Sequence, residues 1–132
     1  MKHPNLLLSG LLLATTAYAQ PDDILQLMQD RGCLRCHQVD ASPAEVTQET
    51  PRAPAWSDIA ARYKSVKGAQ QQLTATVMNG STTDRNSHSP YMRHWDGKVS
   101  GEFMPTHRYA ISEAEAARIV AWVLAIEPKT RP

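Results

Sequence analysis

The chain has 132 residues, with 14 basic and 13 acidic side chains and a formal net charge of +1 at pH 7. A charge this close to zero argues against a general electrostatic affinity for nucleic acid. Apolar residues make up 42% of the chain and charged residues 20%, which argues against disorder, and the length fits one domain with a small apolar core.

Residues 1–19 are predicted to be a secretory signal peptide. Lys2 supplies a positive start, Leu6–Ala14 is an apolar run, and Ala17-Tyr18-Ala19 is a small-x-small cleavage site. The apolar run is shorter than the roughly 20 residues that span a bilayer. We therefore expect a single domain, 20–132, that is soluble in a bacterial periplasm and carries equal numbers of basic and acidic side chains.

The rest of the chain is predicted to form helices, because its apolar residues recur with helical rather than alternating spacing. Asp22 or Asp23 can cap a first helix that runs toward Gly32. A capping box, Ser112 to Glu115, starts a last helix that ends before Pro128. Two shorter helices are expected at about 56–64 and 69–78. The predicted fold class is all-α.

Two segments between these helices are predicted to be loops. Residues 39–53 contain the breakers Pro43 and Pro51. Residues 81–109 are polar and long, and a loop of that length in a compact domain usually has a function.

The first helix is followed by Cys33-Leu34-Arg35-Cys36-His37, which is the C-x-x-C-H attachment pattern of c-type haem. Positions i, i+3 and i+4 share one face of a helical turn, so both sulfurs and the imidazole can meet one porphyrin. A disulfide between the cysteines would close a very short loop and stabilise little. A thioredoxin-like pair expects a βαβ setting, and structural zinc needs four ligands. We predict one covalent haem c on Cys33 and Cys36, with His37 on the iron.

The residues alone do not decide which side chain is the second axial ligand of the haem iron. Met28 and Met78 lie on apolar helix faces, where a core role is the simpler interpretation. Met104 lies in Gly-Glu-Phe-Met-Pro shortly before the last helix, and a thioether there gives a His/Met iron of raised potential. The remaining alternatives are Met92, His88, His94 and His107.

Taken together, these motifs resemble the small bacterial class I c-type cytochromes. The resemblance implies that Met104 is the distal ligand, that the Pro54 carbonyl accepts a hydrogen bond from the proximal imidazole, and that Trp95 contacts the haem or its propionates. It also implies a fold in which the N- and C-terminal helices pack across each other around one haem. The pieces that match are Cys33–His37, Pro54, Asp58–Tyr63, Asn79-Gly80, Trp95, Met104-Pro105 and Ile111–Ile126.

The expected function is periplasmic one-electron transfer, with iron cycling between Fe(II) and Fe(III) and no substrate transformed, so the chain is not expected to be an enzyme. Redox proteins are the expected partners: a periplasmic dehydrogenase or reductase as donor, and a terminal oxidase or other reductase as acceptor. One alternative is an electron-transfer subunit of a periplasmic dehydrogenase, for example one oxidising sulfite. Another is a peroxidase-like haem enzyme, which would need an open position on the iron.

Overall fold

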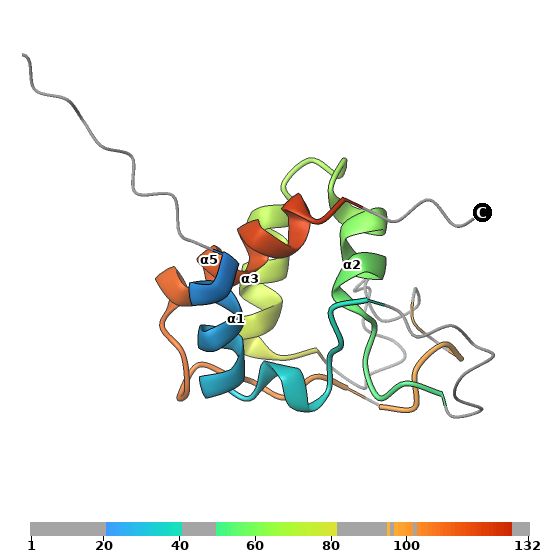
Figure 1. Ribbon diagram of the computed structural model, residues 1–132, viewed down its shortest axis with the longest axis horizontal. Coiled ribbons are helices and arrows are strands. Elements are labelled where there is room, and N and C mark those ends of the chain that lie inside the picture. Colours follow the sequence, from blue (N-terminus) through green and yellow to red (C-terminus); the bar gives the residue numbers. More distant parts are fainter. Residues whose placement is uncertain (1–20, 41–49, 82–94, 96, 102, 128–132) are drawn as a thin grey trace, which may run out of the picture.

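The computed structural model describes residues 21–40, 50–81, 95, 97–101 and 103–127. These residues form four α-helices and one short 3-10 helix, with no strand among them, so the all-α prediction is confirmed (Figure 1). The predicted signal peptide lies outside the described residues. The helices are α1 (Pro21–Asp30), η1 (Cys33–Arg35), α2 (Trp56–Tyr63), α3 (Ala69–Asn79) and α5 (Glu113–Ala125).

Helices α2 and α5 bury the faces that their apolar spacing predicts. In α2 the buried residues are Trp56, Ile59, Ala60 and Tyr63, and in α5 they are Ala116, Ile119, Val120 and Val123. One detail of α1 differs from expectation, because the helix already begins at Pro21. Asp22 and Asp23 therefore lie in its first turn rather than at the cap, where their charge still favours the positive end of the helix dipole.

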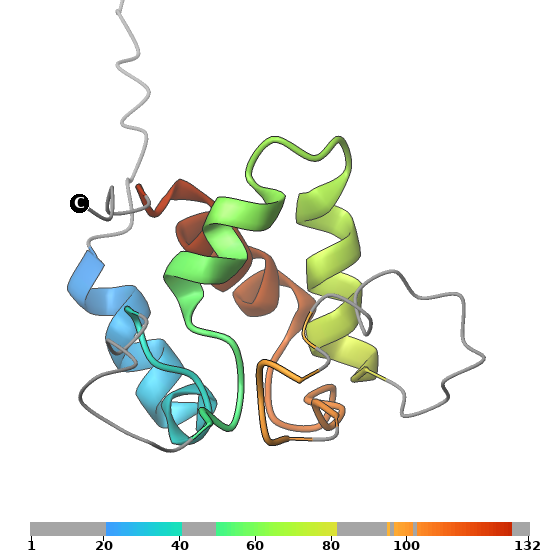
Figure 2. The same ribbon diagram turned by 90° about the vertical axis from the view of Figure 1, so that its right-hand side faces the viewer.

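Helix α5 is the centre of the packing, since it contacts α1, α2 and α3. The views in Figures 1 and 2 show α5 running beside α1 and between the other helices. Ile24 and Met28 of α1 are almost fully buried in the same core as Ile119 and Val123 of α5. The predicted packing of the N- and C-terminal helices is thus confirmed, and Met28 is a core residue.

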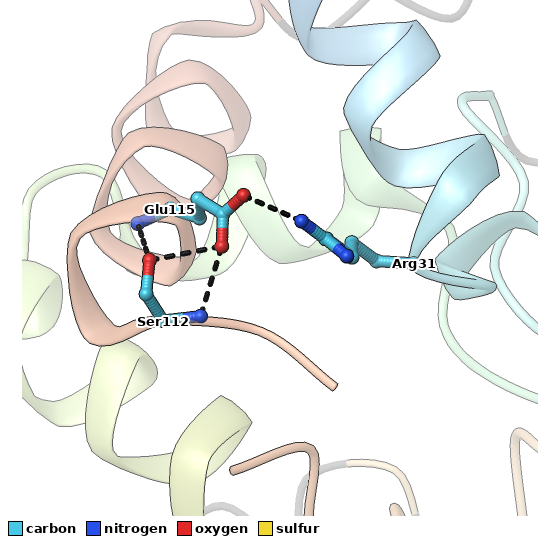
Figure 3. A network of polar contacts seen from close by, with 3 residues as sticks. All are labelled: Arg31, Ser112 and Glu115. Carbon is cyan, nitrogen blue, oxygen red and sulfur yellow. Dashed lines mark hydrogen bonds and ion pairs between the residues drawn. The ribbon is translucent and has the colours of Figure 1, made fainter. Parts of the chain in front are cut away.

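A polar network also joins these two helices (Figure 3). At the start of α5, Ser112 and Glu115 form the predicted capping box: the Glu115 amide donates to Ser112 Oγ at 3.2 Å, and the Ser112 amide donates to Glu115 Oε2 at 2.9 Å. Just after α1, Arg31 Nη2 donates to Glu115 Oε1 at 2.8 Å. The amide of Ser112, followed by Arg31, lowers the pKa of Glu115 to about 2.

The turn that contains η1 and the segment that precedes α5 lie at the same end of the helical group. Both views show them below the helices, in cyan and orange respectively (Figures 1 and 2). This end of the molecule carries the residues that the sequence predicts to hold a cofactor.

Candidate haem site

The cysteine motif begins where α1 ends. Gly32 has φ 75°, a left-handed conformation that turns the chain out of the helix at no steric cost. Within the next turn the Cys33 carbonyl accepts from the Cys36 amide at 3.3 Å and from the His37 amide at 3.1 Å. These bonds close Cys33, Cys36 and His37 into one compact turn, as the spacing predicts.

The two cysteines are half-buried free thiols. Burial raises the pKa of the Cys33 thiol, so this group is protonated near neutral pH. Reactive redox cysteines have a lowered pKa, because the thiolate is the nucleophile. The raised pKa of Cys33 is thus the opposite of what an activated redox thiol requires. No group of three or more His, Cys, Asp or Glu side chains among the described residues is placed to hold a metal ion.

The His37 ring is held in one orientation by Pro54. Nδ1 lies 2.7 Å from the Pro54 carbonyl oxygen, and because a carbonyl can only accept, Nδ1 must carry the proton. The other ring nitrogen, Nε2, then keeps its lone pair and is the atom that can bind a metal. Burial lowers the pKa of His37, the Pro54 carbonyl raises it, and His107 lowers it, with a net lowering that favours the neutral ring.

Trp56 is a site residue that the sequence analysis did not single out, since it predicted only a helix at about 56–64. Its indole stacks on the His37 imidazole, with ring centroids 4.0 Å apart and an angle of 16° between the planes. The contact arises because the first turn of α2 bonds to the chain just after the motif: the amide of Trp56 donates to the Gln38 carbonyl at 2.9 Å and that of Ser57 to the Val39 carbonyl at 3.0 Å. The only sequence signal was the placement of a tryptophan two residues after Pro54.

The indole N–H of Trp56 is buried, and it has no acceptor among the described residues. A buried donor without a partner costs free energy, and such a group in a native structure usually indicates a missing partner. The side chain is 7% exposed and lies against the predicted proximal ligand. The indole N–H therefore needs an acceptor that the described residues do not supply.

Met104 belongs to a second segment, tied to the end of α3. We call residues 104–108 the distal strap. The Ser81 amide donates to the Met104 carbonyl at 2.8 Å, and the Met104 amide donates to Ser81 Oγ at 2.8 Å. Further along the strap, the Thr106 hydroxyl donates to the Met78 carbonyl at 2.6 Å and the His107 amide to the Val77 carbonyl at 3.1 Å. The Met104 side chain is half-buried.

A short pairing joins the chain before the distal strap to the chain before Pro54. The Ser100 amide donates to the Pro51 carbonyl at 2.8 Å and the Gly101 amide to the Arg52 carbonyl at 3.0 Å. A side chain at Gly101 would collide with the Arg52 carbonyl, so this approach requires glycine. The segment that orients His37 through Pro54 is thus also bonded to the segment that leads to Met104.

The other predicted residues are placed as follows. Trp95 is half-buried and packs against the apolar core, and its predicted contact with a haem remains a prediction. Met78 also packs against the core. The Nδ1 atom of His107 lies 2.7 Å from the Pro105 carbonyl. Met92, His88 and His94 lie outside the described residues.

The all-α fold and the cysteine turn are those of a c-type cytochrome. A sequence model of the cytochrome c family matches residues 22–127, so the chain belongs to the cytochrome c family, and within it to the small class I proteins.

Curated relatives agree with this assignment. The chain is 29% identical over 120 residues to cytochrome c-551 of Pseudomonas aeruginosa, covering 91% of this chain and 90% of that protein. It is 30% identical over 102 residues to cytochrome c-551 of Allochromatium vinosum, covering 77% and 84%. The crystal structure of Nitrosomonas europaea cytochrome c552 superposes with a TM-score of 0.54 at 24% identity, over 76% of this chain and 96% of that one, and supports the fold.

Proposed function

We propose that this chain is a periplasmic one-electron carrier with a single haem c, attached through Cys33 and Cys36 and bound axially by His37 and Met104. The family itself consists of haem-based electron carriers. The observation that supports His37 as an iron ligand is the hydrogen bond of its ring. Nδ1 donates to the Pro54 carbonyl at 2.7 Å, so that Nε2 is left to bind iron.

The residues present fit the group. The two free thiols are in the same turn as His37, and Trp56 adds a buried N–H with no described acceptor beside that imidazole. When bound, haem supplies an iron that changes between Fe(II) and Fe(III). The chain contributes the orientation of its ligands and an apolar environment, and both tune the reduction potential.

Met104 is the distal ligand in this proposal. A thioether sulfur is a soft, neutral donor that suits reduced iron, and the strap fixes the Met104 backbone next to the end of α3. With both axial positions taken, the iron has no place for peroxide, which favours a carrier over a peroxidase-like enzyme. Trp95 is proposed to contact the haem or its propionates.

The location and partners belong to the same proposal. Haem attachment to a C-x-x-C-H motif and the signal peptide predicted at 1–19 both favour export to the periplasm. No helix among the described residues has the length and apolar character needed to cross a bilayer. Redox proteins are the proposed donor and acceptor.

Attachment and ligation are tested by expressing the full chain with haem-attachment machinery and purifying the wild type, Cys33→Ala and Met104→Ala. We expect the wild type to keep its colour through acid–acetone extraction and to gain the mass of one haem on the peptide that contains Cys33 and Cys36. Cys33→Ala should give little holoprotein, because only one thioether can form.

The distal ligand is tested on the ferric spectrum of the same preparations. The wild type should show the charge-transfer band of thioether-bound iron, and Met104→Ala should lose the band, lower the potential and bind cyanide readily. Met92→Ala is the control and should retain the band. Extraction of the colour into acetone would contradict attachment, and loss of the band in Met92→Ala alone would move the distal ligand to Met92.

A further inference from the structure

We propose that Ser81 is a positioning residue for Met104, holding the Met104 backbone so that its thioether stays on the haem iron. This inference rests on the proposed function, in which Met104 is the distal ligand. Ser81 itself is not proposed to touch the haem.

Ser81 binds both polar groups of the Met104 backbone. Its amide donates to the Met104 carbonyl at 2.8 Å, and its hydroxyl accepts from the Met104 amide at 2.8 Å. Two bonds to one residue fix the rotation of that residue as well as its position, and so fix the direction in which its side chain leaves the backbone. Both residues are half-buried, so water competes less for these bonds than at an open surface.

The path of the chain into Ser81 depends on Gly80. At the end of helix α3, the Gly80 amide donates a hydrogen bond to the Thr76 carbonyl at 2.8 Å. Gly80 itself has φ 78° and ψ 171°, a backbone conformation that is essentially open to glycine alone. A Cβ on Gly80 would lie 2.7 Å from the Met104 carbonyl oxygen and 2.8 Å from the Thr106 nitrogen. The distal strap therefore passes directly over Gly80, and this close approach brings Met104 within reach of the next residue, Ser81.

Other bonds of the strap attach residues after Met104. The Thr106 hydroxyl donates to the Met78 carbonyl at 2.6 Å, and the Arg108 guanidinium donates to the Asn79 side chain. These bonds hold the strap on α3 without involving the Met104 backbone. A variant at Thr106 thus removes one side-chain hydrogen bond between the same two elements and serves as a matched control.

The test compares wild type, Ser81→Ala, Ser81→Thr and Thr106→Val as ferric holoproteins. Cyanide binds only when Met104 has left the iron, so its binding rate reports how often the ligand detaches. Loss of one ordinary hydrogen bond shifts such an equilibrium about fivefold. Ser81→Ala should therefore bind cyanide about fivefold faster and lose the thioether band at a lower temperature. Ser81→Thr keeps the hydroxyl and should return both values to those of the wild type.

Thr106→Val should lower the thermal midpoint but leave the cyanide rate unchanged. Three results would each overturn the role of Ser81. Ser81→Ala could bind cyanide at the wild-type rate, Thr106→Val could accelerate cyanide binding as much as Ser81→Ala does, or Ser81→Thr could fail to restore the wild-type rate. A wild type that lacks the thioether band would overturn the proposed ligand set as well. A wild-type band with an unaffected Ser81→Ala variant overturns the role of Ser81 alone.

Discussion

At the scale of single residues, the His37 imidazole has two restraints of different kinds. The Pro54 carbonyl sets which ring nitrogen is protonated, and the Trp56 ring, stacked at 4.0 Å, limits how the imidazole can rotate. A hydrogen bond alone allows a ring to swing about the bond, whereas a stacked neighbour in a packed interior does not. His37 is thus oriented before any partner reaches its Nε2 atom.

This dual role of Trp56 predicts unequal effects of two substitutions. Trp56→Ala leaves a cavity beside His37 and should lower the free energy of unfolding by about 3–5 kcal/mol. Trp56→Phe keeps an aromatic ring and should cost on the order of 1 kcal/mol. Denaturant unfolding followed by circular dichroism measures both values. Equal losses would show that an aromatic ring at position 56 does not by itself restore stability.

At the scale of elements, the end of α3 is the attachment point of the distal strap, and glycine makes that attachment possible. Gly80 and Gly97 both have positive φ, 78° and 70°, but among the described residues only Gly80 of the two has backbone atoms of another segment within reach of a Cβ. Substituting alanine at each position therefore separates two costs of a side chain: the strain of a positive φ, which both positions have, and the collision with another segment, which only Gly80 has.

Gly97→Ala should lower the free energy of unfolding by about 1–2 kcal/mol, the cost of placing an L-residue at positive φ. Gly80→Ala carries that cost and must also push the strap away from α3, so we expect a loss of at least about 3 kcal/mol. The ferric thioether band should weaken in Gly80→Ala and persist in Gly97→Ala. Similar losses in both variants, with the band intact, would contradict a tight approach at Gly80.

At the scale of the whole molecule, sequence reasoning succeeded wherever the information is local. The apolar spacing of α2 and α5, the Ser112 capping box and the compact turn of Cys33–His37 depend on residues within one or two turns of each other. The stacking of Trp56 and the bonds of Ser81 were missed because they join segments 19 and 23 residues apart, and the family resemblance, which implied the bond between Pro54 and His37, implied neither of them. No periodicity encodes which carbonyl or ring a distant side chain will meet.

The Glu115 carboxylate accepts hydrogen bonds from Ser112 in its own capping box and from Arg31 just after α1, and it makes stability depend on pH. The Ser112 amide and Arg31 hold the pKa of Glu115 at about 2, against an ordinary value of 4.5. Because the folded-state pKa is the lower of the two, the stabilisation is complete above pH 4.5 and is lost as the pH falls from 4.5 toward 2.

Glu115→Gln removes the titrating group, so the variant should be less stable than wild type at neutral pH, and the difference should shrink as the pH falls through that range. Thermal midpoints of both holoproteins at closely spaced pH values measure this difference. Acid also titrates the haem propionates and weakens the bonds of the iron to its ligands, but those effects are common to both proteins and cancel in the comparison.

Glu127→Gln is the matched control, because Glu127 is 88% exposed and pairs with Lys64 on the surface. Its midpoint should follow that of wild type at every pH. A constant gap between Glu115→Gln and wild type would show that the charge of the Glu115 carboxylate does not make stability depend on pH.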